Sequence, residues 1–151
     1  MNALENCFRR RQLLKVEPSL IKSERSIQES YKWLKESHKN IEGSAYSSAQ
    51  LSTYLVFFHA ARAVLYRDGV REKSHYCIGV YLEAYQNEGL LEENWIILFD
   101  RMRNNRHAGQ YSFQVEPTKE EVESGIKSAV NFLKRIIELL RTTEPLAIDL
   151  Y

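Results

Sequence analysis

The residues best suited to chemistry in this 151-residue chain are concentrated between Arg101 and Tyr111. Starting one position earlier, the chain reads Asp-Arg-Met-Arg-Asn-Asn-Arg-His-Ala-Gly-Gln-Tyr, at the end of an apolar helical pattern. Arginine presents a planar, permanently charged fork that matches phosphate oxygens, and histidine is the side chain most easily poised to move a proton near neutral pH. The combination indicates a phosphodiester or a nucleotide as the target.

Helix geometry limits which of these side chains can meet within one chain. Each residue turns an α-helix by about 100°, which places Arg103 and His107 within about 40° of each other on one face. Arg101 lies about 120° from His107, so this pair would cooperate only across a dimer seam or through a distorted helix end. Arg106 and Tyr111 face a similar separation. Either of these two pairs therefore favours a site built from two chains.

Further polar groups interrupt the most apolar part of the chain. His59, Arg62 and Tyr66 follow one another at three and four residues. His59 and Arg62 are candidates to line the same cleft and orient phosphate, although such a stripe is also typical of a buried hydrogen-bond network. Lys73 and His75 precede an expected helix start, where an anion could bind, but ordinary surface basicity is the simpler explanation.

Composition restricts the class of protein. A chain with 44% hydrophobic and 27% charged residues can bury one core and is too short for two ordinary domains, so residues 1–151 are predicted to form a single domain. The formal net charge of +1 excludes a globally basic nucleic-acid binder, and any attraction to phosphate must come from a local patch. Residues 101–107 are the best such patch.

Cysteine usage and hydropathy indicate a compartment. Cys7 and Cys77 have neither the paired spacing of a zinc site nor the pattern of a disulfide framework, which predicts two buried or inert free thiols in a reducing environment. The most apolar run, residues 54–63, is interrupted by His59 and Arg62 and is too short to span a bilayer. We therefore expect a cytoplasmic protein without a membrane segment.

The elements that must position these residues are predicted to be helices. The chain has only 6 glycines and 3 prolines, and its apolar residues recur at three- and four-residue spacing. No strand is expected. The predicted fold is all-α, an antiparallel up-and-down bundle of four long helices with additional short helices, built from residues 3–16, 19–41, 44–67, 74–89, 91–107 and 118–142.

The start of the last helix and the buried face of the helix at 19–41 are also predicted. Thr118 and Glu121 have the spacing of a capping box at the start of the last helix. The helix at 19–41 should bury one broad stripe of side chains, namely Leu20, Ile27, Tyr31, Leu34, His38 and Ile41.

Three more segments carry a family resemblance. They read Tyr-Ser-Ser-Ala at 46–49, Phe-His-Ala-Ala-Arg-Ala-Val-Leu-Tyr at 58–66 and Arg-Glu-Lys-Ser-His at 71–75. Their order and spacing resemble the small prokaryotic HEPN proteins, named for higher eukaryote and prokaryote nucleotide-binding domains. Residues 101–111 fall where this family carries its signature of an arginine, four to six intervening residues and a histidine. The resemblance covers about residues 19–140, the expected core of the domain.

The resemblance implies a fold and an activity. Similar proteins are up-and-down helical bundles that dimerise and bring two copies of the signature into one cleft. They are metal-independent endoribonucleases that need no cofactor, often the toxin of a toxin-antitoxin pair whose antitoxin is a minimal nucleotidyltransferase. The histidine would accept or deliver the proton of the RNA 2′-hydroxyl reaction, while arginine would stabilise the charge growing on the phosphorane oxygens.

Two registers of the signature remain open. In one, Arg101 or Arg106 stabilises phosphate and His107 is the general acid or base, with Arg103, Asn104, His59 and Arg62 helping to bind RNA. In the other, Arg106 pairs with Tyr111, a variant in which tyrosine occupies the histidine position. Family members of that kind look catalytically reduced, so this register implies a module that binds a nucleotide or a nucleotidyltransferase partner.

Overall fold

The protein is mostly helical, as predicted. The computed structural model describes residues 2–111 and 116–147, with the backbone alone for residues 107–111. Among the described residues, no helix combines the length and apolar character needed to cross a membrane. The helices are α1 (Ala3–Arg9), α2 (Leu20–Glu42), α3 (Tyr46–Asp68), α4 (His75–Asn87), α5 (Glu93–Tyr111) and α6 (Lys119–Thr142).

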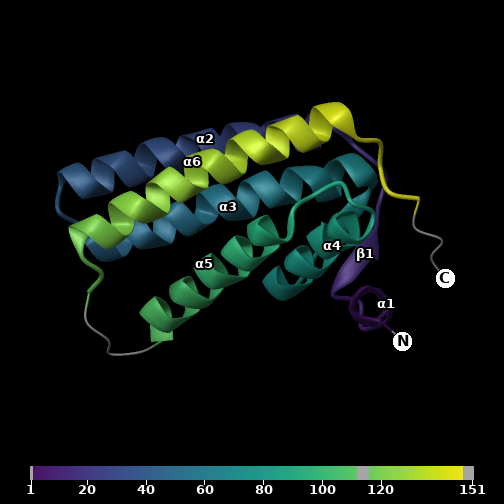
Figure 1. The fold of residues 1–151 in the computed structure, drawn as a ribbon, viewed down its shortest axis with the longest axis horizontal. Helices are drawn as coiled ribbons and strands as arrows, with labels where there is room; N and C mark the ends of the chain where they lie inside the picture. The colour runs from purple at the N-terminus through teal and green to yellow at the C-terminus, as the bar shows by residue number, and fades with distance from the viewer. Residues whose placement is uncertain (1, 112–115, 148–151) are drawn as a thin grey trace.

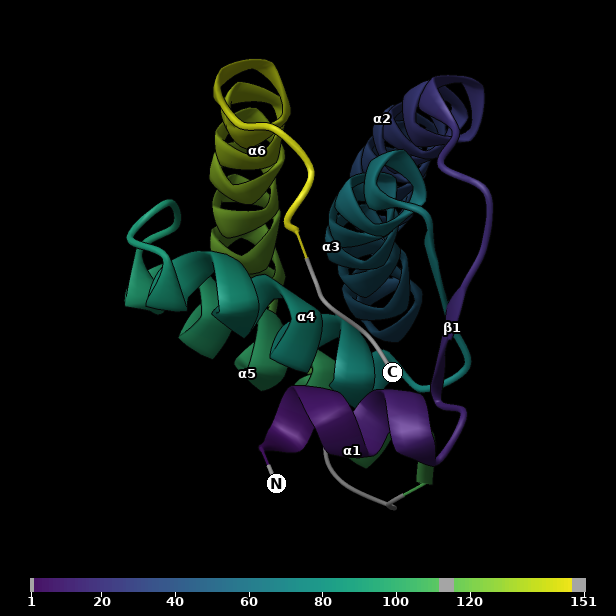
Figure 2. The ribbon, with the colours of Figure 1, turned by 90° about the vertical axis from the view of Figure 1, so that its right-hand side faces the viewer.

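The long helices form two groups. Helices α2, α3 and α6 lie side by side along the longest axis of the molecule, whereas α5 is inclined to them (Figure 1). Helix α3 is the most buried of the three and also packs against α4 and α5. The short helix α1 lies across α4 at the end of the molecule seen in Figure 2. Three of the four predicted long helices are thus aligned, and the fourth, α5, crosses α3 obliquely.

The buried face of α2 differs from its predicted stripe. Leu20 is 75% exposed and Tyr31 is 50% exposed, and His38 is exposed as well. The fully or nearly buried positions are serines, because small side chains let α2 and α3 approach closely. Ser23, Ser26 and Ser30 each donate a hydrogen bond of 2.8 Å to a backbone carbonyl of α3, at Ala63, His59 and Val56 respectively. The helical spacing of large side chains predicts the stripe, and it gives no signal for a buried row of serines.

The expectation of no strands and of a first helix over residues 3–16 is wrong. Helix α1 ends at Arg9, and Arg11 then adopts a φ of 58°, which reverses the chain. Strand β1 (Leu13–Lys15) pairs antiparallel with β2 (Val70–Glu72), with Leu13 opposite Glu72. Pairing requires Gly69, whose φ is 80° and whose added Cβ would lie 2.7 Å from the Val16 carbonyl oxygen.

The prediction of free thiols is also wrong. Cys7 of α1 and Cys77 of α4 form a disulfide, with their Cα atoms 5.9 Å apart. The two residues are 70 positions apart in sequence, and only the β1–β2 pairing brings α1 beside the start of α4. A long-range pairing of this kind leaves no trace in cysteine spacing, which explains the error.

The N-cap half of the capping box predicted at Thr118 is confirmed, and Ser74 caps α4 in the same way. The Thr118 hydroxyl accepts a hydrogen bond of 3.1 Å from the Glu121 backbone N–H at the start of α6. The Ser74 hydroxyl accepts one of 3.3 Å from the Cys77 N–H at the start of α4. The second cap matters for the site, because it fixes the first turn of α4, which carries His75.

Candidate functional site

Helix α5 turns two of its arginines toward the protein. Phe99 is fully buried, and Arg103 and Arg106 lie four and seven residues further along, within about 40° and 20° of the same direction. Both are partly buried. Arg101 and Asn104 lie on the far side of the helix, about 160° and 140° from Phe99, and both are exposed. Of the predicted arginines, the structure therefore brings Arg103 and Arg106 to one surface and leaves Arg101 outside it.

Aromatic rings hold these two guanidinium groups, which we call the α5 cation pair. The Arg106 Cζ lies 5.3 Å from the ring centroid of Tyr54, a side chain that is wholly buried in α3. The Arg103 Cζ lies 5.6 Å from the ring of Tyr76 on α4. Such stacking fixes a guanidinium without using its hydrogen-bond donors.

The donors of the α5 cation pair are only weakly engaged. Asp100 Oδ1 lies 3.8 Å from the Arg103 Nε, which makes an ion pair but is too long for a hydrogen bond. The Nε atoms of Arg103 and Arg106 are buried without a hydrogen-bond partner among the described residues. A buried donor without a partner is costly, so these side chains gain hydrogen bonds by turning toward an acceptor such as a phosphate oxygen.

His75 adjoins the α5 cation pair and lay outside the predicted site. Its Nδ1 is 2.8 Å from the Tyr54 hydroxyl, and its ring stacks on Phe58 with centroids 4.4 Å apart. Burial lowers the pKa of His75, and the positive charges of Arg106, Arg62 and Arg103 lower it further. His75 is thus a partly buried, neutral side chain beside the α5 cation pair. The sequence instead predicted that it only adds positive charge to the surface. The one sequence signal for its position is Ser74, a helix-capping residue directly before it, which places His75 in the first turn of α4.

Arg62 and His59 line a separate groove. Arg62 also contacts the Phe58 ring, on which His75 stacks. The α2–α3 groove, a cavity of about 320 Å³, is lined by Lys22, Arg25, Ser26 and Glu29 of α2 and by His59, Arg62 and Tyr66 of α3. The Arg62 Cζ lies 5.3 Å from the Phe58 ring and 4.9 Å from the Tyr66 ring. Burial and the charge of Arg62 lower the pKa of His59 to about 4, so this side chain is neutral near pH 7.

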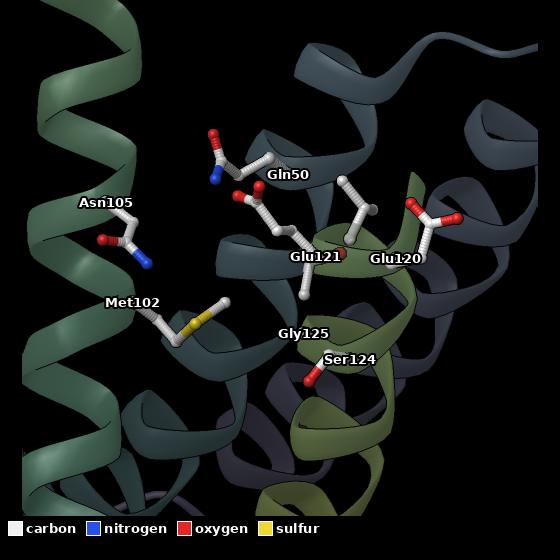
Figure 3. A pocket seen from close by; sticks show the side chains of 9 residues that line it. Gln50, Met102, Asn105, Glu120, Glu121, Ser124 and Gly125 are labelled. Atoms are coloured by element: carbon white, nitrogen blue, oxygen red, sulfur yellow. The ribbon is translucent and has the colours of Figure 1, made fainter. Parts of the chain in front are cut away.

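A second cavity of about 430 Å³ lies on the other flank of α5 (Figure 3). Met102 and Asn105 of α5 face the first turns of α6, which carry Glu121 and Ser124, with Gln50 of α3 between them. Its lining contains two carboxylates and no cation among the described residues. It is therefore unsuited to phosphate, and the two flanks of α5 differ in chemistry.

Two of the predicted site residues, His107 and Tyr111, belong to the last turns of α5, and their side chains lie outside the described residues. Within the described part of the chain, no group of three or more His, Cys, Asp or Glu side chains is arranged to hold a metal ion. The described geometry supplies fixed positive charge, neutral imidazole and aromatic rings, a set suited to binding a nucleotide phosphate.

Comparison with known proteins gives two matches. The family model described as HEPN domain matches residues 23–140. A protein of Methanocaldococcus jannaschii named "Putative toxin MJ0605" is 32% identical over 104 residues, which cover 66% of this chain and 75% of that protein. The matched region contains α3, α4, α5 and nearly all of α2 and α6, and it leaves α1 and β1 outside.

Proposed function

Because this chain belongs to the HEPN domain family, we propose that it is the toxin of a toxin-antitoxin pair and cleaves RNA without a metal ion. The observation that carries this proposal is the α5 cation pair, two arginines one turn apart with buried, unpartnered Nε donors among the described residues. The likeness to a relative named as a toxin supports the biological role. We further propose that residues 1–151 act as one domain, an up-and-down bundle with its core at about 19–140.

The proposed reaction begins at the RNA 2′-hydroxyl. His107 takes the proton from this hydroxyl as its oxygen attacks the adjacent phosphorus, and the bond from phosphorus to the 5′-oxygen then breaks. The protonated His107 gives this proton to the leaving 5′-oxygen, and the products are a 2′,3′-cyclic phosphate and a 5′-hydroxyl. Arg106 and Arg103 stabilise the negative charge that grows on the non-bridging oxygens.

A homodimer completes the proposed site. Arg106 is favoured over Arg101 as the phosphate-stabilising arginine, because Arg101 is exposed on the far side of α5. On this proposal two α5 ends meet at a dimer seam, and Asn104, exposed near the end of α5, orients RNA or an arginine of the other copy. The antitoxin would be a minimal nucleotidyltransferase that associates with the same end of the molecule.

The test is RNA cleavage by purified protein in the presence of EDTA. Wild-type protein should cut a labelled single-stranded RNA, and a matched RNA with one 2′-deoxy nucleotide at the cut position should stay intact there. His107→Ala should abolish cleavage without changing the melting temperature. The proposal is wrong if folded, dimeric protein leaves both structured and single-stranded RNA intact.

The position of Arg106 also favours a second candidate function. Arg106, rather than Arg101, lies on the cationic surface, and the residue five positions after it is Tyr111. Tyrosine has a pKa of about 10 and is a poor base near neutrality, but it donates hydrogen bonds and can accept a nucleotidyl group. A binding module of this kind would retain a nucleotide or a nucleotidyltransferase without turnover. Loss of cleavage in a stable His107→Ala variant would eliminate it.

A further inference from the structure

The α2–α3 groove contains a rigidly held arginine. The Arg62 Nε lies 2.8 Å from Glu72 Oε1, and the Glu72 side chain is only 6% exposed. The Phe58 and Tyr66 rings flank the same guanidinium. The contact with Glu72 is an ion pair without hydrogen-bond geometry, since the Arg62 Nε has no hydrogen-bond partner among the described residues. The ion pair and the two rings hold the guanidinium in place, and its terminal nitrogens are the donors that a ligand would use. This preorganisation reduces the entropy lost when an anion binds.

Flexible cations surround this fixed group. Lys22 and Arg25 are exposed on α2, and the Lys22 Nζ lies 5.9 Å from the centre of the Tyr66 ring. Glu29 is the one carboxylate among the lining residues, and Glu72 offsets the charge of Arg62 from behind the groove, so the three cations and two carboxylates leave one net positive charge. His59 is neutral near pH 7 and offers hydrogen bonding without charge. The groove therefore suits a phosphate with a sugar or base attached.

A continuous row of contacts joins this groove to the α5 cation pair. Arg62 lies over Phe58, Phe58 stacks on His75, His75 bonds to Tyr54, and Arg106 lies over Tyr54. The α3 members of the row are spaced four residues apart, at 54, 58 and 62. Eight helical residues rise about 12 Å, which is the length of roughly three to four nucleotides at 3.4 Å each in a stacked strand.

We propose that the α2–α3 groove is a second phosphate subsite, which holds single-stranded RNA three or four nucleotides away from the phosphate bound by Arg103 and Arg106. This proposal rests on the proposed RNA-directed function and names the form of its substrate. The row has a cation at each end, Arg62 and Arg106, with the neutral His75 ring and the buried rings of Phe58 and Tyr54 between them. It therefore fixes the spacing of two positively charged sites, the feature by which a protein can hold successive phosphates of one strand. A dinucleotide is too short to occupy both ends of the row, whereas an octanucleotide reaches both.

The experiment measures affinity against RNA length. Labelled 2′-O-methyl oligouridines, which cannot undergo attack by the 2′-oxygen, are titrated by fluorescence anisotropy as a dinucleotide, an octanucleotide and a dodecanucleotide. The variant is Lys22→Gln/Arg25→Gln. Its matched control is Lys35→Gln/Lys39→Gln, which removes the same charge from exposed positions of α2 outside the groove.

The groove variant should bind the two longer oligonucleotides about tenfold more weakly, because two phosphate contacts are lost. The slope of log affinity against log salt should become shallower by about 1.4, or 0.7 for each lost contact with a single strand. Binding of the dinucleotide, and all binding by the control variant, should stay close to wild type.

Several results would overturn the subsite. They are an equal loss for dinucleotide and dodecanucleotide, an equal loss in the control variant, or tighter binding of duplex than of single-stranded RNA. If the wild type binds the dodecanucleotide in a way that Arg106→Gln abolishes but the groove variant leaves unchanged, the subsite alone is wrong. If the wild type binds RNA of no length, the proposed function fails together with the subsite.

Discussion

Arg67, near the end of α3, and Arg106 of α5, which lies over Tyr54 of α3, differ in how their guanidinium groups are satisfied. Arg67, the last arginine of α3, donates from Nε to Asp68 at 2.9 Å, from one Nη to the carbonyl of Thr143 at 2.8 Å, and from the other to the Tyr85 hydroxyl at 2.6 Å. Arg106 rests on the ring of Tyr54 with its Nε unpartnered among the described residues.

The Arg67 network, formed by Arg67, Asp68, Tyr81, Tyr85 and Thr143, satisfies its charges internally. The hydroxyls of Tyr81 and Tyr85 both donate to Asp68 Oδ2, the first at 2.7 Å. Burial raises the pKa of both tyrosines, and the negative charge of Asp68 raises it further. A satisfied network stabilises the fold and leaves no donor for a ligand, whereas Arg103 and Arg106 keep donors without a partner among the described residues.

Removal of Arg67 should have the largest effect on stability. We expect Arg67→Ala to lower the free energy of unfolding by about 3–5 kcal/mol, because Asp68 would keep a buried, uncompensated charge. Equilibrium unfolding in urea measures this loss. Arg141→Ala, at an exposed position of the same end, is the control and should change stability by no more than about 0.5 kcal/mol. Equal effects of the two substitutions would contradict the structural role of the network.

The disulfide should contribute the next largest effect. Breaking Cys7–Cys77 should cost about 2–4 kcal/mol, since the bond closes a long loop in the unfolded chain. Unfolding is compared with and without a dithiol reductant, and the Cys7→Ser/Cys77→Ser variant should be less stable and should no longer respond to the reductant. Wild-type protein that is equally stable in both conditions, with two titratable thiols, would show that the bond is absent.

Gly79 of α4 lies directly beside Asp100 of α5. A Cβ at this position would lie 2.9 Å from Asp100 Oδ1, the carboxylate that pairs with Arg103. Gly79→Ala should therefore displace the Asp100 carboxylate from Arg103 and weaken RNA binding, with little loss of stability because the end of a flexible side chain can move away. The control is Gly125→Ala in α6, whose Cβ would meet Met102 and Thr53 at ordinary contact distances of 3.5 and 3.7 Å.

Gly125→Ala should stabilise the protein by about 0.5–1 kcal/mol, because alanine loses less backbone freedom in a helix than glycine. Thermal unfolding of both glycine variants measures the difference. A stable Gly79→Ala variant with unchanged RNA affinity would show that Asp100 does not position Arg103.

A pH dependence of stability tests the burial of His59. The folded pKa of His59 is about 4, against 6.5 for the ordinary side chain, because the site is buried and lies beside Arg62. Between these values the unfolded chain binds more protons, so stability is complete above pH 6.5 and is lost as the pH falls toward 4. His59→Gln should flatten this slope in thermal melts, and His75, whose pKa is also lowered, should retain part of it. An unchanged slope would contradict the burial of His59.

Much of the site could be predicted from local sequence. The hydroxyls of Ser74 and Thr118 each accept a hydrogen bond from the backbone N–H three residues later. Such a cap can be predicted because both partners lie in the same short segment. The orientation of Arg103 and Arg106 follows from their spacing of four and seven residues after Phe99, a buried aromatic residue. The same spacing excludes Arg101 from that surface, a distinction that the motif alone does not make.

The remainder depends on contacts between distant segments. His75 joins the site only because Tyr54, 21 residues earlier, donates or accepts at its Nδ1. Cys7 meets Cys77 only after β1 and β2 pair, and the serine seam of α2 exists only because α3 offers carbonyl oxygens to it. Hydropathy and spacing carry no information about such partners, so sequence reasoning missed them.

The claim that RNA phosphate binds at Arg103 and Arg106 is tested most directly by comparing Arg106→Gln with Arg101→Gln, two equal charge changes on one helix. In an RNA cleavage assay with EDTA, Arg106→Gln should slow cleavage by about 10²–10³-fold at unchanged melting temperature, as expected for the loss of one donor to the transition state. Arg101→Gln should cut RNA at nearly the wild-type rate. Retained cleavage in Arg106→Gln, together with its loss in Arg101→Gln, would contradict the claim.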